Sequence, residues 1–172
     1  MTTLTQLCDR VEKKHHALIR KNISEIEAMI TEIVNHNEED YPFLNRVLKR
    51  FQEVADTLAM HIQQEETIIL PYIEKLEEAA SKGGSPPNVH FPTLKIPVEF
   101  INKEHDVALK GMNQIREYTS NYFLPMYANG KLRKLYTQLQ EFEKALEDAI
   151  KLEEKTLFPQ AIKLEAELND NH

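Results

Sequence analysis

Several histidine and glutamate residues stand at spacings that would bring metal-binding side chains together. His61 and Glu65 are four residues apart, so a helix would place both on one face. His105 and Glu153 also occupy positions where the surrounding pattern calls for leucine. Imidazoles and carboxylates on facing helices suit a first-row metal, and carboxylates can bridge two ions. The alternative for the same residues is a buried histidine–glutamate hydrogen-bond network without metal.

These residues lie in four segments with helical periodicity. Clusters of Pro, Gly and Asn mark loops at 35–42, 81–92 and 124–130. Between and beside them we predict helices at 3–35, 43–79, 97–121 and 131–168. Pro71 and Pro159 fall inside two of these segments and predict local distortion of the helices there.

The apolar positions repeat in alternating steps of three and four, which is typical of a helix-bundle seam. In the second segment the seam runs through Leu44, Val47, Phe51, Val54, Leu58, His61, Glu65, Ile68 and Tyr72. Short turns between such segments predict an all-α, antiparallel up-down-up-down four-helix bundle.

The first segment offers two adjacent histidines for the same seam. The apolar stripe that begins at Ile19 leads back to His16, whereas the stripe that begins at Leu4 favours His15. Periodicity alone leaves this choice open.

The heights of the polar residues along the bundle follow from their distances to the turns. In an antiparallel hairpin, two residues equidistant from the turn lie at the same height. Positions 16 and 61 are centred on 38.5, positions 61 and 105 on 83, and positions 105 and 149 on 127. Each centre falls in a predicted loop, so we expect these four positions to share one layer. Glu65 and Glu153 lie one turn away on the same faces.

The sequence also contains an internal repeat. HIQQEETIILP (61–71) aligns without gaps to AIKLEEKTLFP (149–159). Upstream, KKHHALIRKNISEI (13–26) aligns to NKEHDVALKGMNQI (102–115). The chain is therefore predicted to be a duplicated helical hairpin.

The repeat assigns partners to the candidate residues. It pairs His16 with His105, which favours His16 over His15. It pairs His61 with Ala149, so the second half lacks a histidine that the first half has. We predict a single domain over 1–172, whose halves at about 1–80 and 93–168 are joined by the loop 81–92.

Composition limits the possible function. The 172 residues include 21 basic and 28 acidic side chains, which gives a net charge of −7. Such a chain is a poor match for nucleic acid or an anionic membrane. Cys8 is the only cysteine, which excludes an internal disulfide and a cysteine-built metal site. No apolar run approaches the roughly 20 residues that span a bilayer, and the first residues lack a signal-peptide pattern, so a cytoplasmic location is expected.

Taken in order, the segments VEKKHHALIR, HIQQEETIILP, NKEHDVALKG, TSNYFLPMYANG and KLEEKTLFP resemble the hemerythrin-like HHE cation-binding domain. Within that group the chain is similar to the di-iron domain of the repair-of-iron-centres (RIC) family. The resemblance covers nearly the whole chain and implies a non-haem iron centre with terminal histidines and bridging glutamates. The ligands that it implies here are His16, His61, Glu65, His105 and Glu153.

The resemblance also implies a function. Such proteins are associated with nitrosative and oxidative stress and with repair of iron–sulfur clusters. The expected small molecules are O₂, NO or peroxide, and the expected protein partners are iron–sulfur proteins. Iron is the expected cofactor, as one or two ions, although manganese or zinc suits the same ligands.

The sequence departs from the family pattern at Ala149, where a methyl group cannot bind a metal. The ion nearest this position is expected to be held more weakly. Glu147 and Glu154 are nearby carboxylates that offer a substitute ligand. The runner-up function is a non-catalytic mononuclear metal binder or sensor. A third is a degenerate structural bundle that acts through partner association, such as a homodimer.

Other polar residues are expected to have different roles. Glu104 is expected to be exposed, with support of a metal-binding histidine as the alternative. His36 is expected near the end of the first helix, because twenty residues of helix place it roughly 30 Å from His16. Cys8 is expected to be a small buried apolar residue.

Overall fold

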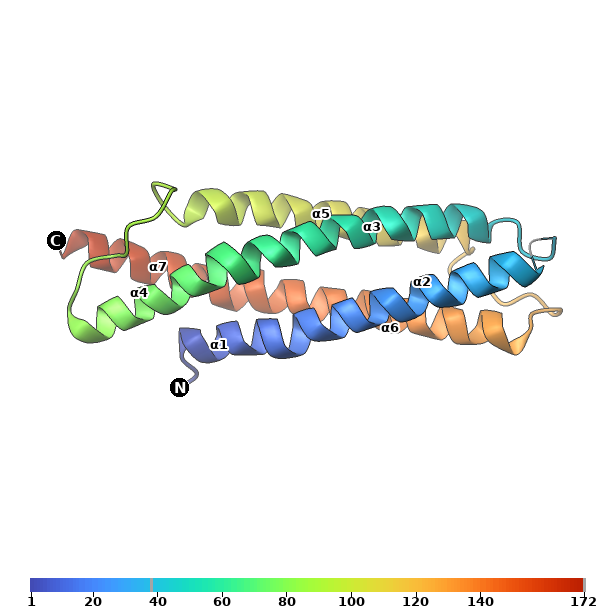
Figure 1. Cartoon of the computed structure of the whole chain (residues 1–172), viewed down its shortest axis with the longest axis horizontal. Helices are drawn as coiled ribbons and strands as arrows, with labels where there is room; N and C mark the ends of the chain where they lie inside the picture. The colour runs from blue at the N-terminus through green and yellow to red at the C-terminus, as the bar shows by residue number, and fades with distance from the viewer. Residues whose placement is uncertain (38, 172) are drawn as a thin grey trace.

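The computed structural model describes residues 1–37 and 39–171, and this part of the chain forms four long helical rods packed side by side (Figure 1). The first rod comprises α1 (Leu4–Arg10), η1 (Val11–His16) and α2 (Ala17–Asn37). The second comprises α3 (Leu44–Gln64), η2 (Glu65–Ile69) and α4 (Leu70–Lys82). The third is α5 (Lys95–Tyr118), and the fourth comprises α6 (Gly130–Leu152), η3 (Glu153–Leu157) and α7 (Phe158–Asp170).

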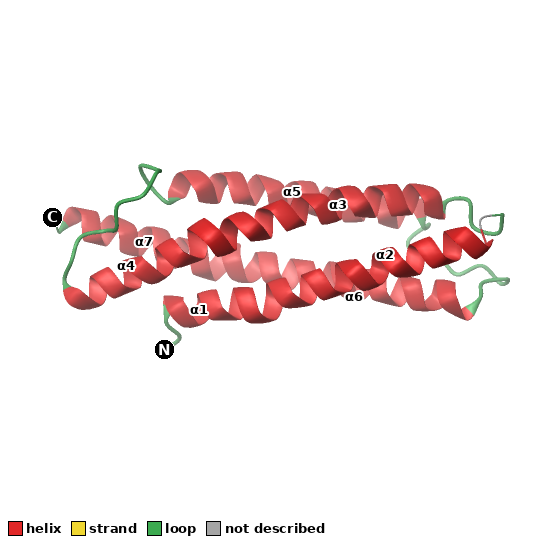
Figure 2. Ribbon diagram, in the orientation of Figure 1, coloured by secondary structure: helices red, strands yellow, loops and turns green. Residues whose placement is uncertain are grey.

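The rods run alternately up and down, and the described residues contain no strand (Figure 2). The predicted all-α, antiparallel four-helix bundle is therefore confirmed. The third rod begins two residues before Pro97, at Lys95, and ends at Tyr118 rather than near residue 121. Both termini and the loop 83–94 lie at one end of the bundle, and the two other loops lie at the opposite end (Figure 1).

Local signals set several of the helix ends. The Thr3 hydroxyl accepts a hydrogen bond from the Gln6 N–H at the start of α1, and the Gln6 side-chain oxygen accepts one from the Thr3 N–H. The Asn129 side chain accepts a hydrogen bond from the N–H of Leu132 at the start of α6. Gly83 ends α4 in the left-handed conformation, with φ of 65°.

The two prolines inside the rods coincide with wider, π-helical turns. The N–H of Leu70 donates to the Glu65 carbonyl, and the N–H of Phe158 donates to the Glu153 carbonyl. Both bonds span five residues instead of four. Pro71 and Pro159 follow directly and have no N–H to donate to the carbonyl four residues earlier. The local distortions predicted at these prolines take this form, at matching positions of the repeat.

The π-helical turn corrects one position of the predicted seam. Ile68 is 50% exposed, whereas Ile69 is 2% exposed and lies in the core. A π-helical turn holds one more residue than an α-helical turn, so it shifts the buried face by one position. Placing Ile68 in the seam was therefore wrong, because regular α-periodicity was assumed through residues 65–69.

The candidate polar residues lie between two apolar clusters. One cluster includes Phe51 and Phe142, whose rings meet edge to face with centroids 5.3 Å apart. The other includes Leu76, Leu94 and Phe158, near the loop 83–94. In every rod the change from one cluster to the other falls at the polar layer. Apolar packing on both sides therefore isolates this layer from bulk water.

Helices α3 and α5, from the second and third rods, approach closely at Gly111. A Cβ atom added there would overlap the side chain of Val54 on α3. Val54 is β-branched and buried, so it has little freedom to move aside.

We therefore expect Gly111→Ala to lower the free energy of unfolding by about 1–3 kcal/mol, because overpacking outweighs the gain in helix propensity. Chemical denaturation would measure this change. Gly130→Ala is the matched control, since in the described part of the chain nothing lies within 4 Å of an added Cβ. Equal stability of the two variants would contradict this account of α3–α5 packing.

Candidate metal centre

The five residues predicted as metal ligands converge in the middle of the bundle. One ligand-type atom from each of His61, Glu65, His105 and Glu153 lies within 4.8 Å of the others. His16 joins them, because its Nε2 lies 2.9 Å from Glu65 Oε2 and 3.7 Å from Glu153 Oε1. All five side chains are buried.

The ring nitrogens of the histidines point toward one another. The Nε2 atoms of His61 and His105 are 3.0 Å apart. His105 Nε2 is also 3.0 Å from Glu153 Oε2, and His61 Nε2 is 3.5 Å from Glu65 Oε2. Each carboxylate therefore lies between His16 and one other imidazole.

A second set of carboxylates holds the histidines from outside. The Nδ1 atoms pair with carboxylate oxygens, namely His16 with Glu66 at 3.0 Å, His61 with Glu104 at 3.1 Å and His105 with Glu154 at 2.8 Å. An ionised carboxylate only accepts hydrogen bonds, so each Nδ1 carries the proton and donates it. The Nε2 of each ring then faces the centre and offers its lone pair there when the ring is neutral, which is the usual arrangement of a metal-bound histidine.

Arg20 fixes one of these outer carboxylates. Its guanidinium donates two hydrogen bonds of 2.7 Å to the two oxygens of Glu66. These bonds lower the pKa of Glu66 and keep it ionised. Glu66 is therefore held in a state that can accept the proton of His16.

The inward-facing atoms lack protein partners. Among the described residues, no hydrogen-bond partner exists for His16 Nε2, for either carboxylate oxygen of Glu65, or for Glu153 Oε2. The short distances between these atoms do not have hydrogen-bond geometry. Buried polar atoms without partners cost free energy, and one cation would satisfy several of them together. The donor set, three imidazoles and two carboxylates, fits a first-row metal.

The pKa shifts of the residues in the layer also favour a bound cation. Burial and the charge of Glu153 raise the pKa of Glu65 to about 8. Burial opposes the charged form of His16, but the nearby carboxylates of Glu153 and Glu65 outweigh it and raise the pKa of His16 to about 10. Burial, together with His105, lowers the pKa of His61 to about 4. The two carboxylates therefore attract positive charge, while His61 stays neutral and able to bind a metal.

Ala149 occupies the fourth position of the layer. It is 2% exposed and lines a cavity of about 10 Å³ together with Leu58, Ile150 and Glu153. The nearby carboxylates considered as substitutes do not reach this place. Glu154 accepts a hydrogen bond from His105 on its outer side, and Glu147 is exposed.

Several polar residues have roles that the sequence did not indicate. Glu66 and Glu154 support histidines, and their matching positions in the repeat were a signal that could have found them. The expectation that Glu104 is exposed was wrong: it is half-buried and takes the alternative role of supporting a histidine, but that histidine is His61 and not its neighbour. His36 lies in α2 and donates to the Glu32 carbonyl at 2.8 Å, away from the centre.

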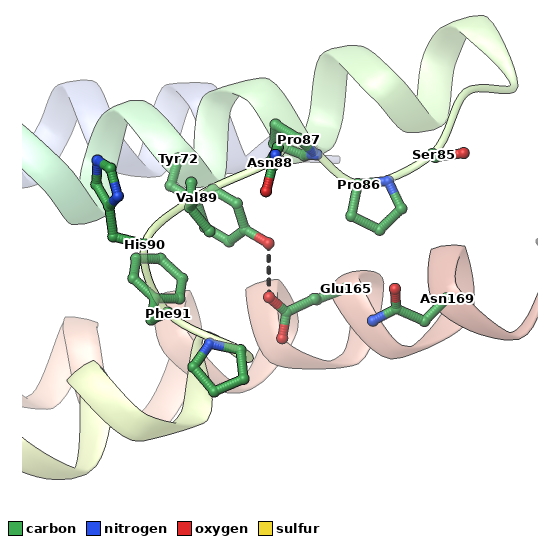
Figure 3. A pocket seen from close by; sticks show the side chains of 11 residues that line it. Tyr72, Ser85, Pro86, Pro87, Asn88, Val89, His90, Phe91, Glu165 and Asn169 are labelled. Carbon is green, nitrogen blue, oxygen red and sulfur yellow. Dashed lines mark hydrogen bonds between the residues drawn. The ribbon is translucent and has the colours of Figure 1, made fainter.

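A cavity much larger than the one at Ala149 lies elsewhere in the described chain. It measures about 620 Å³ and lies beneath the loop 83–94 at the end of the bundle (Figure 3). Its buried carboxylate, Glu165, accepts hydrogen bonds from the Tyr72 hydroxyl at 2.6 Å, the Thr93 hydroxyl at 2.7 Å and the Leu94 N–H at 3.0 Å. Glu165 is thus fully paired and anchors the loop, in contrast to Glu65.

Comparison with known proteins agrees with this geometry. A family model described as the hemerythrin HHE cation-binding domain matches residues 9–161. The chain belongs to this family. The hemerythrin resemblance stated from the sequence is therefore confirmed.

The hemerythrin-like chain is also similar to curated relatives. It is 26% identical over 161 residues to the iron-sulfur cluster repair protein YtfE of Yersinia pseudotuberculosis serotype O:1b (strain IP 31758). It is 24% identical over 160 residues to the protein of the same name from Yersinia pestis (strain Pestoides F). Each alignment covers 93% of this chain and 66% of the relative, so the chain spans just under two thirds of the length of these relatives.

Within the described residues, none of the helices combines the length and the apolar character needed to span a bilayer.

Replacing the outer carboxylate Glu66 should weaken metal binding without removing a ligand. We expect Glu66→Gln to lower the metal affinity about 10- to 100-fold, because His16 loses the acceptor that sets its tautomer and orientation. Competition with a chromophoric chelator would measure the affinity. Glu12→Gln, at an exposed position of the same rod, is the control. An unchanged affinity in Glu66→Gln would show that His16 is oriented by other contacts.

Replacing Glu65 should stabilise the metal-free protein. We expect Glu65→Gln to raise its free energy of unfolding by about 1–3 kcal/mol near neutral pH, because a buried carboxylate without hydrogen-bond partners is removed. The pKa of Glu65 is raised from 4.5 to about 8 in the folded state. The unfolded chain therefore ionises first, and the wild-type protein loses stability relative to the variant as the pH rises through this range.

Denaturation of both proteins across this pH range would measure the difference. At acidic pH Glu65 is protonated in both states, so its contribution to the pH dependence should vanish there. Glu25→Gln, at an exposed position, is the control. A stability difference that shrinks with rising pH would contradict the expected burial cost.

Proposed function

We propose that His16, His61, Glu65, His105 and Glu153 bind non-haem iron, as one or two ions. The main support is that their inward-facing nitrogen and oxygen atoms converge in a buried layer and have no hydrogen-bond partners among the described residues. Membership of the cation-binding family supports the same assignment. Manganese or zinc would suit the same donor atoms.

The protein would use this iron toward O₂, NO or peroxide, or would supply iron for iron–sulfur cluster repair under nitrosative or oxidative stress. The names of the YtfE relatives support this proposal, as does a donor set suited to a redox-active metal. Iron would supply redox and Lewis-acid chemistry at the centre. Iron–sulfur proteins are the proposed partners, and the cytoplasm is the proposed location.

The residues of the chain would have different roles at the metal centre. Glu65 lies between His16 and His61, and Glu153 lies between His16 and His105, so each carboxylate would hold metal together with two imidazoles. The outer carboxylates keep the Nε2 lone pairs directed inward. The apolar clusters above and below exclude bulk water from the layer.

Ala149 favours a second candidate function. With five protein ligands instead of six, the centre would hold one ion well and a second only weakly. A mononuclear, non-catalytic binder or sensor of a small molecule is therefore the runner-up. The two candidates differ in the number of irons per chain.

The test is the iron content per chain, with an absorption spectrum, of protein purified without air or chelator. We expect between one and two irons per chain, and near-UV bands of an oxo-bridged ferric pair if both sites fill in air. Glu65→Gln/Glu153→Gln should lose the iron, because both carboxylate ligands are removed. Glu165→Gln is the control, since it changes a buried carboxylate outside the centre. Iron that stays with the Glu65/Glu153 variant, or a wild-type protein that takes up none, would contradict the proposal.

A further inference from the structure

A hollow of about 300 Å³ lies on the surface between the first and fourth rods, which run side by side (Figure 1). Among the described residues that line it, four are cations and only Asp148 is acidic. The cations are Arg10 and Lys14 on the first rod, and Lys151 and Lys155 on the fourth. We call this surface the basic hollow. Its charge is opposite to that of the whole chain, which has a net charge of −7.

The four cations of the basic hollow are exposed, and their charge is available to a partner. In the described part of the chain none of the four has an ion-pair partner, whereas the nearby Lys13 pairs with Asp9. Asp148, the acidic residue of the hollow, pairs instead with Lys144 at 3.5 Å. A concave surface of one sign attracts molecules of the opposite sign. The basic hollow is therefore suited to an acidic partner.

The internal repeat does not account for this charge. It places Glu99, Lys103, Gln63 and Thr67 at the positions that match the four cations. These four side chains carry one negative and one positive charge, which cancel. The excess of positive charge is therefore specific to the surface between the first and fourth rods.

The basic hollow lies at the height of the metal centre. His15 lines the hollow, while the next residue, His16, reaches Glu65 in the buried layer. On the fourth rod Leu152 lines the hollow, while the next residue, Glu153, belongs to the layer. The hollow and the layer are thus on opposite sides of the same helical turns, separated by roughly 10 Å, the diameter of a helix. A molecule would need a channel to cross this thickness of packed protein, but an electron would not.

The proposed iron chemistry requires a source of electrons. Reaction with O₂ or peroxide oxidises ferrous iron to ferric iron, so a further reaction requires that the iron be reduced again. Cys8 is the only cysteine, so the chain has no pair of thiols that could supply electrons by forming a disulfide. The electron must therefore come from another molecule, and the surface nearest the layer is a favourable place for it to dock.

We propose that the basic hollow is the docking surface for a small acidic iron–sulfur protein that reduces the metal centre. The cluster of the reduced partner would be oxidised by one electron, which would reduce one ferric ion of the centre to ferrous, and no bond would form or break. Interfaces between electron-transfer partners are small, and opposite charges steer their association. This inference rests on the proposed iron centre and names the partner that would supply it with electrons.

Docking is tested with the protein as purified and an oxidised plant-type ferredoxin, a small acidic iron–sulfur protein, as the probe. Isothermal titration calorimetry at low ionic strength would measure the affinity. The matched variants are Lys151→Glu/Lys155→Glu in the hollow and Lys110→Glu/Lys134→Glu at exposed positions outside it, which change the net charge equally. We expect the hollow variant to bind ferredoxin about ten-fold or more weakly than the other variant, because a charged concave surface raises the local concentration of its partner 10- to 1,000-fold.

Electron transfer is tested by mixing reduced ferredoxin with the iron-loaded ferric protein and following the absorption of the ferredoxin cluster. At low ferredoxin concentration we expect the hollow variant to be reduced about ten-fold or more slowly than the matched variant, for the same reason. Reduced methyl viologen is a small cation that needs no acidic docking partner. It should reduce the hollow variant at least as fast as the matched variant.

The possible outcomes separate this inference from the proposed function. Equal ferredoxin affinity of the two double variants, or a wild-type protein that does not bind ferredoxin, would overturn the docking surface and leave the iron centre standing. Weaker docking without slower reduction would overturn the role of the hollow in electron transfer. Iron content is measured in every variant, and a wild-type protein without iron would overturn the proposed function and the electron transfer together.

Discussion

The burial of Glu65 and Glu153 in one layer, without hydrogen-bond partners for their inward oxygens among the described residues, is the constraint on which the rest of the structure depends. A carboxylate removed from water costs several kcal/mol unless it is neutralised or paired. The bundle tolerates this layer because apolar clusters stabilise it on both sides. The free-energy cost of burying these carboxylates lies at the position where a bound cation would remove it. The stability of the fold is therefore linked to metal binding.

The π-helical turns η2 and η3 supply carboxylates to the same buried layer. Glu65 and Glu153 are the first residues of these turns, and a proline follows each turn at the same distance. The outer carboxylates Glu66 and Glu154 are the next residues along the chain. One inward and one outward carboxylate thus come from consecutive positions, so each hairpin supplies a carboxylate of the buried layer and a support for an imidazole together. The internal repeat of the sequence is consistent with both halves sharing this arrangement.

The two halves nevertheless offer the centre different surroundings. The side with His61 and Glu104 is closed by a hydrogen-bonded pair, whereas the repeat places Ala149, which offers neither a ligand nor a hydrogen bond, at the position that matches His61. The layer is therefore asymmetric, although the repeat places similar residues around most of it.

The sequence by itself determined the bundle, the polar layer, the five converging residues and the missing histidine at Ala149, because helical periodicity and loop positions specify which face and which height each residue takes. It did not determine the seam position of Ile69, because a π-helical turn breaks the assumed period. Only the tertiary structure decided that Glu104 supports His61 and that Glu165 anchors a loop. These features depend on which side chains meet across different rods, and periodicity within one helix carries no information about that.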